Sequence, residues 1–278
     1  MALPQDKWLI EGNRRLHYLD WGNLGATPML LVHGLCCEAH YWDSFARSMH
    51  QKYHVVAVDL RGHGESSWTG NYSPKEYSAD LTRLVDRLAL DDIVLIGHSL
   101  GGIVSILYYA EQPERVARLV VVDNGPEINA ARMEQVKRDF ANRSIIYNSE
   151  EEALKQLEQE STYYSEEYKR HLLKYSMMRD ESGRLSYKYD PSLHHAELGT
   201  LEWLLPYMKK IACPALVVHG TESDVLLAAA ARRIPETLPG WVVVDIERAG
   251  HFVMGDNPEA FGAAINDFLL GSTGPSYK

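Results

Sequence analysis

Short apolar runs recur along the chain, and most are followed by a polar turn and then by apolar residues at helical spacing. Runs of four or five apolar residues are too short for a helix and are typical of strands buried on both faces of a sheet. Strands that alternate with helices in this way predict a mostly parallel sheet with right-handed crossovers. The runs occupy residues 28–32, 55–58, 93–96, 119–122, 214–218 and 241–244.

The segments around these runs carry the signals of helices and of one hairpin. Residues 8–19 alternate between polar and apolar positions, which predicts a β-hairpin. Apolar residues in 41–49 repeat at helical spacing. The tetrapeptide at 73–76 has a serine, a proline and, three residues after the serine, a glutamate, which is typical of a capped helix start. An Asn-Pro pair at 257–258 predicts the start of a last helix.

The pattern changes between residues 127 and 206, which contain no clear buried strand. This segment is polar, has helical spacing and includes a strongly acidic run at 150–160. An insertion of about 80 residues is too long for a simple loop in an α/β sheet. We therefore predict an α/β core, formed by residues 1–126 and 207–278, that carries a helical cap formed by residues 127–206.

Composition narrows the classes of partner. The chain has 278 residues, of which 45% are hydrophobic, so it can bury a large core. Its net charge of −10 argues against nucleic acid and anionic membranes as partners. The adjacent Cys36 and Cys37, with Cys213 as the third cysteine, are a poor basis for disulfides. With no signal segment or membrane-length apolar run, we expect a cytoplasmic monomer or homodimer that acts on a small molecule.

The run at 93–96 leads directly into Gly97-His98-Ser99-Leu100-Gly101, and residues 103–110 then have helical spacing. A strand must therefore stop, turn sharply and continue as a helix within a few residues. Such a turn exposes the Ser99 hydroxyl above the sheet and leaves the Leu100 amide at a helix N-terminus, where negative charge is stabilised. Ser99 is the candidate nucleophile.

A serine hydroxyl needs a base to take its proton, and the base needs an acid to orient it. His251 is the best base candidate, because it lies between the last strand and the last helix and can reach the same end of the sheet. The acid is expected just after the preceding strand, where Asp224 lies. The order Ser99, Asp224, His251 is the one that accompanies this type of turn.

These motifs resemble those of the α/β-hydrolase superfamily, and in particular its capped serine hydrolases, such as small bacterial carboxylesterases. The resemblance covers nearly all of residues 7–270. It implies an α/β-hydrolase fold, a mostly parallel sheet flanked by helices with the cap inserted after the strand that ends near Asp123. It also implies an oxyanion hole formed by the amides of Leu35 and Leu100, and no metal or organic cofactor. The matching segments are 33–34, 59–66, 97–102 and 250–252.

One departure from the family pattern concerns the acid. In many relatives the acid lies three residues after the glycine that is Gly220 here, but that position is Ser223, and Asp224 follows at four. A one-residue adjustment of the loop would make Asp224 the acid, which is our first choice. Asp123, at the end of the strand after the 103–110 helix, is the alternative, because some relatives use that position. Glu222 is a remote third.

The substrate pocket is harder to predict, because cap aromatics and methionines serve packing as well as binding. His33 and His98 are expected to pack beside the oxyanion loop and the serine turn, with His33 also a candidate for the pocket. The further pocket candidates are Trp42, Tyr163, Tyr164, Met178 and Trp203.

The sequence thus predicts a serine hydrolase that cleaves a small, fairly apolar carboxylic ester through an acyl-enzyme intermediate. A C–C bond hydrolase of ring-cleavage products, a lactonase or a cofactor-free perhydrolase would use the same triad. Ring-cleavage substrates carry carboxylates, so that alternative predicts an arginine in the cavity, for which Arg179 and Arg184 are candidates. A binding protein that keeps the hydrolase fold is a third class, which the apparently intact triad disfavours.

Overall fold

A computed structural model describes residues 3–142, 146–161, 163–195 and 200–271 of the chain. Its centre is an eight-stranded sheet in the order β1-β2-β4-β3-β5-β6-β10-β11. The first hairpin and the β2–β4 pair are antiparallel, and the remaining pairs are parallel. The strands are β1 (Gln5–Glu11), β2 (Arg14–Asp20), β3 (Pro28–Val32), β4 (His54–Val58), β5 (Ile93–His98), β6 (Val116–Val122), β10 (Ala215–Gly220) and β11 (Trp241–Ile246).

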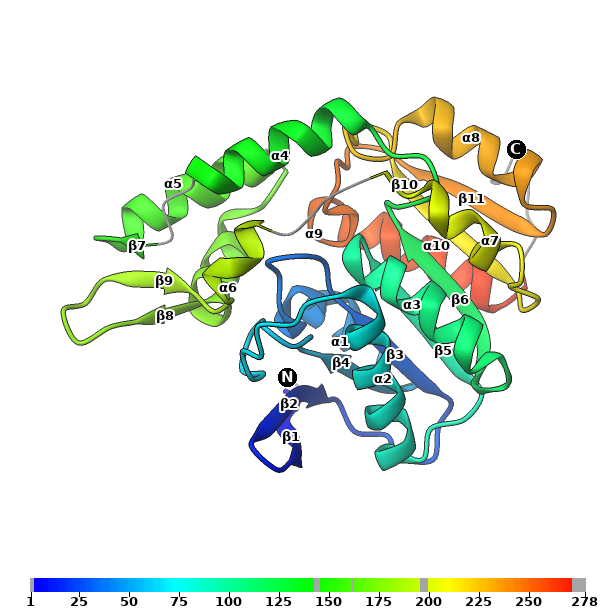
Figure 1. The fold of residues 1–278 in the computed structure, drawn as a ribbon, viewed down its shortest axis with the longest axis horizontal. Helices are drawn as coiled ribbons and strands as arrows, with labels where there is room; N and C mark the ends of the chain where they lie inside the picture. The colour runs from blue at the N-terminus through cyan, green and yellow to red at the C-terminus, as the bar shows by residue number, and fades with distance from the viewer. Residues whose placement is uncertain (1–2, 143–145, 162, 196–199, 272–278) are drawn as a thin grey trace.

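Helices cover both faces of this sheet (Figure 1), which explains why its parallel strands are mainly apolar. Leu30 and Val32 pack into a cluster with residues of α2, α3 and α8, while Met29 and Leu31 pack into a second cluster with residues of α1, α9 and α10. The α-helices of the core are α1 (Asp43–Met49), α2 (Pro74–Leu88), α3 (Leu100–Glu111), α8 (Ala228–Thr237), α9 (Val253–Asp256) and α10 (Pro258–Leu269), and the short 3-10 helices are η1 (Ala39–Trp42) and η2 (Pro113–Arg115).

Most of the segment between β6 and β10 forms a lobe beyond one end of the sheet, whereas its last helix, α7 (Leu205–Met208), lies against the core (Figure 1). The lobe is not purely helical, because it also contains a three-stranded sheet in the order β7-β9-β8. Strands of two or three residues have no sequence pattern of their own, so the prediction of a helical cap missed them. The elements are α4 (Ala130–Asn142), β7 (Ile146–Tyr147), α5 (Glu150–Glu160), α6 (Glu166–Ser176), β8 (Met177–Arg179), β9 (Leu185–Tyr187), η3 (Pro191–His195), η4 (Glu202–Leu204) and α7 (Leu205–Met208).

The end of this segment already belongs to the packing of the core. Leu204 and Met208 are fully buried in the same cluster as α2 and α3. The domain boundaries at residues 126 and 207 therefore stay a prediction, although a lobe is visible beside the core.

Polar contacts join the lobe to the core at several points. The Ser176 hydroxyl donates a hydrogen bond of 2.9 Å to the buried carboxylate of Glu38. Lys188 pairs with Glu65 at 2.8 Å, and the hydroxyl of Tyr72 donates to the carboxylate of Asp190. The lobe is thus held over the carboxyl ends of the parallel strands, where active sites of open α/β sheets are found. None of the described helices is both long and apolar enough to cross a bilayer.

Candidate active site

The turn between β5 and α3 holds Ser99 in a strained conformation. Its φ of 51° and ψ of −115° are rare for a residue with a side chain and cost roughly 1–3 kcal/mol. The turn is possible because glycines flank it: a Cβ on Gly97 would lie 2.2 Å from the carbonyl oxygen of Gly101, and one on Gly101 would lie 2.2 Å from that of Val32. The sequence pattern thus predicted a turn that only these glycines allow.

Two backbone amides border the nucleophile. Leu100 is the first residue of α3, so its amide is among those without an acceptor inside the helix. Leu35 follows β3 in a loop that packs against the turn, since a Cβ on Gly34 would lie 3.3 Å from the Cβ of Ser99. Leu35, Leu100 and Ser99 line the same cavity. This arrangement suits an oxyanion hole, whose amides are worth roughly 3–4 kcal/mol each.

His251 reaches the same cavity from the loop between β11 and α9. Its Nδ1 lies 2.7 Å from Oδ2 of Asp123, and the carboxylate of Asp123 is completely buried. A buried anion at Nδ1 fixes the ring so that Nε2 is the nitrogen available to a nucleophile. Ser99 and His251 line one cavity, and His251 contacts a buried carboxylate, an arrangement that suits a catalytic triad.

The carboxylate of Asp123 is held by three donors. The amide of Gly220 donates to Oδ1 at 3.2 Å, and the Ser223 hydroxyl donates to Oδ2, the oxygen that also meets His251. Asp123 itself has a φ of 48° at the end of β6, where its amide donates to the carbonyl of Val218. These contacts fix the orientation of the carboxylate.

Asp224, the first choice for the acid in the sequence analysis, does not contact His251 in the structure. The side chain of Asp224 is 59% exposed, and its Oδ2 lies 2.6 Å from Nε of Arg132, on the lobe. Its carbonyl oxygen accepts a hydrogen bond from Asn129. Glu222 also lines the cavity and hydrogen-bonds Tyr163 instead of His251. The alternative acid of the sequence analysis, Asp123, is the carboxylate that contacts the histidine.

His98 supports the loop that carries the base. Its Nε2 donates a hydrogen bond of 2.9 Å to the carbonyl oxygen of His251, and the two rings lie 4.7 Å apart between centroids. Burial, helped by the nearby His251, lowers the pKa of His98 well below its usual value. The ring of His98 is therefore neutral, and its contact with the carbonyl oxygen of His251 positions the loop.

His33 has a structural role in the oxyanion loop. It is fully buried, its Nδ1 donates to the carbonyl oxygen of Gly34 at 2.7 Å, and its Nε2 accepts from the amide of Leu60 at 2.9 Å. Burial lowers the pKa of His33, so the ring is neutral in the tautomer that these contacts require. It does not line the cavity.

The cavity above Ser99 has a volume of about 1350 Å³. Apolar and aromatic side chains form much of its lining, which also contains carboxylates from the core and from the lobe. Among the described lining residues, Arg132 is the one arginine or lysine, and both Asp139 and Asp224 pair with it, at 3.3 and 2.6 Å. The acidic lining residues are Asp139, Glu222, Asp224 and Asp256.

Of the predicted pocket residues, Tyr163 and Trp203 line this cavity. Trp42, Tyr164 and Met178 do not. Trp42 is fully buried in the core beside Phe45 and Phe261, Tyr164 packs on Phe252, and Met178 is 41% exposed on β8.

The two arginines proposed for a carboxylate-binding cavity also lie elsewhere. Arg179 pairs with Glu150 at 2.6 Å and Arg184 with Asp180 at 2.9 Å, and both arginine side chains are about half exposed. The sequence analysis missed Tyr41, Tyr72 and Phe252, which line the cavity. Phe252 could have been found from its place next to His251, whereas Tyr41 follows an apolar pattern that looks like core packing and Tyr72 lies in a polar loop with no such signal.

Metal-ligand spacing occurs once among the described residues, in His40, Asp43 and His171, and this group lies outside the cavity lining. The candidate active site itself consists of groups suited to acyl transfer.

Comparison with known proteins agrees with the fold. The profile of a family described as "Alpha/beta hydrolase family" matches residues 29–264. The 2-(acetamidomethylene)succinate hydrolase of Mesorhizobium japonicum is 27% identical over 260 residues, which cover 88% of this chain and 89% of the relative. The esterase Rv0045c of Mycobacterium tuberculosis is 27% identical over 260 residues, which cover 90% and 85%.

A solved structure extends the similarity to the whole chain. The crystal structure of an alpha/beta hydrolase from Novosphingobium aromaticivorans superposes with a TM-score of 0.83 at 27% sequence identity, and covers 97% of this chain and 99% of that one. The family profile matches most of the chain, and the eight-stranded sheet and the strained serine turn agree with this match. The chain belongs to the alpha/beta hydrolase family.

Proposed function

We propose that this protein is a serine hydrolase that cleaves a small, neutral and fairly apolar carboxylic ester through an acyl-enzyme intermediate. The observation that carries the proposal is the 2.7 Å contact between His251 Nδ1 and the buried Asp123, with Ser99 in the same cavity. It supplies a nucleophile, a base and an anion that orients the base, which together activate a serine hydroxyl.

In the proposed reaction Ser99 Oγ attacks the ester carbonyl carbon while Nε2 of His251 takes the hydroxyl proton. The charge on the carbonyl oxygen is stabilised by the amides of Leu35 and Leu100. Asp123 stays ionised and stabilises the imidazolium. His251 then gives its proton to the leaving alcohol. It next takes a proton from water as the water oxygen attacks the acyl carbon, and it returns this proton to Ser99 Oγ when the bond to the serine breaks and the carboxylic acid leaves.

The charges around the cavity support a neutral substrate. A carboxylate on the substrate needs a free cation, but Arg132 is already shared by Asp139 and Asp224. Glu222 and Asp256 add further acidic groups to the lining. These neighbours disfavour the carboxylated ring-cleavage products considered above. The same acidic groups disfavour, for this protein, a succinate derivative such as the one in the name of the Mesorhizobium relative.

Hydrolysis of p-nitrophenyl butyrate by the wild-type protein and by Ser99→Ala tests the chemistry. The variant should lose at least about 10³-fold in kcat. A fluorophosphonate should label the wild-type protein on Ser99, as seen by peptide mass spectrometry. Full activity in Ser99→Ala would exclude the proposal.

Matched esters test the substrate class. We expect a p-nitrophenyl ester with an uncharged acyl chain to be hydrolysed with at least about 10-fold higher kcat/KM than one of equal length that ends in a carboxylate. An equal or reversed preference contradicts a neutral substrate while leaving the triad chemistry intact.

A further inference from the structure

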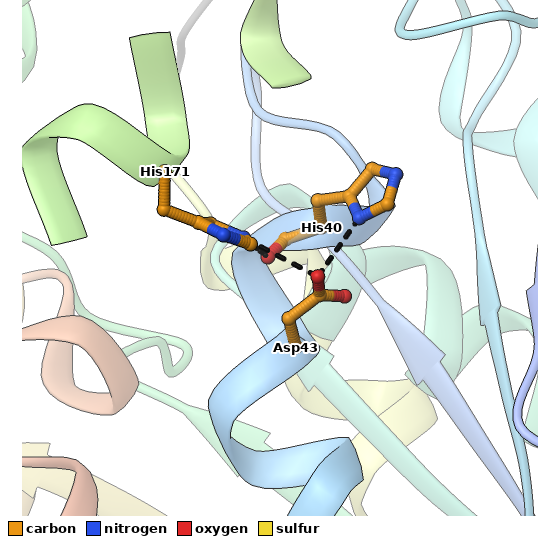
Figure 2. Close-up of side chains that lie close together, drawn as sticks. All are labelled: His40, Asp43 and His171. Atoms are coloured by element: carbon orange, nitrogen blue, oxygen red, sulfur yellow. Dashed lines mark hydrogen bonds and ion pairs between the residues drawn. The ribbon is translucent and has the colours of Figure 1, made fainter. Parts of the chain in front are cut away.

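Two histidines and an aspartate meet where the lobe touches the core, outside the cavity. His40 lies on η1, Asp43 is the first residue of α1, and His171 lies on α6 of the lobe. Figure 2 shows both rings directed at the carboxylate of Asp43. Nδ1 of His40 is 2.9 Å and Nε2 of His171 is 3.3 Å from the same oxygen, Oδ2.

The other oxygen of this carboxylate has no protein partner. The side chain of Asp43 is 8% exposed, and Oδ1 is buried with no hydrogen bond among the described residues. An unpartnered oxygen on a buried carboxylate is costly unless a donor or a cation completes it. The carboxylate is therefore short of positive partners at the point where two imidazole nitrogens converge.

We propose that His40, Asp43 and His171 form a binding site for a divalent transition-metal ion such as Zn²⁺. One ligand atom from each of the three residues lies within 4.8 Å of the others. In a tetrahedral site with bonds of about 2.0–2.1 Å, neighbouring ligand atoms are roughly 3.3 Å apart. Small shifts of the side chains are sufficient to receive the ion.

The chemistry of the donors selects the ion. Imidazole nitrogens suit zinc, copper and nickel, whereas calcium and magnesium prefer sites made of oxygen atoms. Both rings must offer a bare nitrogen, so binding displaces the proton between His40 and Asp43 and the proton between His171 and the carbonyl oxygen of His40. Water completes the coordination, because the side chains of His40 and His171 are 14% and 22% exposed and leave an entry path.

Neighbouring aromatic rings hold the ligands in place. The ring of His40 stacks on Tyr175 with centroids 3.8 Å apart, and the ring of His171 lies 4.7 Å from that of Tyr175. The Nε2 of His171 now lies 3.1 Å from the carbonyl oxygen of His40, and this contact would be given up when the nitrogen binds the ion. Because His171 comes from the lobe and the other two ligands come from the core, a bound ion would join the two.

Calorimetric titration of the chelator-treated, full-length protein with Zn²⁺ tests the site. The wild-type protein should bind one ion per chain, and the thermal midpoint should rise by about 5 °C at saturation. His171→Gln and Asp43→Asn keep the size and polarity of each side chain but should weaken binding at least about 100-fold and abolish the thermal shift. His50→Gln removes an exposed histidine outside the cluster and should bind as the wild type does.

Two readouts separate loss of the site from loss of the fold. Circular dichroism and the thermal midpoint without metal should be close to the wild-type values in His171→Gln. Co²⁺ in place of Zn²⁺ should give the visible absorption of a four-coordinate ion in the wild type and not in this variant. Weak binding by the wild type, or equally tight binding by the folded His171→Gln protein, overturns the proposal.

Discussion

The hydroxyl of Ser223 donates a hydrogen bond to Oδ2 of Asp123, the oxygen that also meets the ring of His251. Ser223 occupies the position, three residues after Gly220, where the family pattern expects the acid itself. Since β6 and β10 are neighbouring parallel strands, their carboxyl ends deliver both side chains to one place. One strand end thus supplies the carboxylate that contacts His251, and the other supplies a hydroxyl that donates to this carboxylate.

Replacing the acid distinguishes the two candidates. Asp123→Asn should lower kcat for p-nitrophenyl butyrate by about 10³–10⁴-fold, because the amide no longer stabilises the imidazolium or its correct tautomer. Asp224→Asn should change kcat by less than about threefold, since Asp224 pairs with Arg132 at the surface. Steady-state kinetics with circular dichroism as the folding control measures both. The opposite ranking would return the role to Asp224.

The contact between Asp123 and Ser223 predicts that the carboxylate can be moved from position 123 to position 223. In the double variant Asp123→Asn with Ser223→Asp, a carboxylate at position 223 should come within reach of His251 Nδ1. We expect at least about 10-fold recovery of kcat over Asp123→Asn alone. A control with Ser223→Asn in the same background should give no recovery. If the double variant is as inactive as Asp123→Asn, position 223 cannot serve the histidine.

The sequence predicted the parts of the site that depend on order along the chain. Ser99 needs a strand, two glycines and a helix in succession, and His251 needs the last strand before it, so both positions can be found from pattern alone. The acid could not be assigned in this way. Asp123 and Asp224 follow strands that are adjacent in the sheet, and which carboxylate reaches the ring depends on the path of one short loop.

Local sequence signals also explain why the fold was easier to predict than the pocket. Buried strands and capped helices have strong local signals: the hydroxyl of Ser73 does accept from the amide of Glu76 at the start of α2. Pocket residues have no such signal, because Trp42 in the core and Tyr41 in the cavity wall are neighbours in one apolar pattern. The lobe strands of two or three residues are too short to be predicted at all.

Buried neutral histidines should make the protein sensitive to acid. Burial lowers the pKa of His63 to about 3, below the value of about 6.5 expected in the unfolded chain. Below about pH 6.5 the unfolded state takes up a proton that the folded state does not, so stability falls as the pH falls. His63 contributes up to about 1.4 kcal/mol per pH unit to this loss.

Urea unfolding of the wild type and of His63→Phe, near pH 7 and at about pH 5, checks this prediction. Whatever the phenylalanine costs at neutral pH, the variant should lose less stability between the two conditions. Equal losses in the two proteins would show that His63 is protonated in the folded state, or that its pKa is the same in the folded and unfolded states.

The close approach of main chains at the serine turn should make Gly101 intolerant of a methyl group. Gly101→Ala would press Cβ against the carbonyl oxygen of Val32, and we expect a loss of about 1–3 kcal/mol or more in the free energy of unfolding. Gly262→Ala, in α10, meets no atom within 4 Å and should instead stabilise by roughly 0.5–1 kcal/mol. Urea unfolding compares the two, and similar effects would contradict the steric argument.

The lobe begins only a few residues after Asp123, and this limits how the enzyme can exchange one specificity for another. Asn124 donates a hydrogen bond of 2.8 Å to the carbonyl oxygen of Ser99, so the first residues beyond β6 still support the nucleophile. A recombination event, natural or engineered, that replaces the lobe must keep its upstream crossover beyond Asn124. A lobe from a relative can then replace the original one as a unit. A crossover a few residues earlier would remove Asp123 together with the lobe.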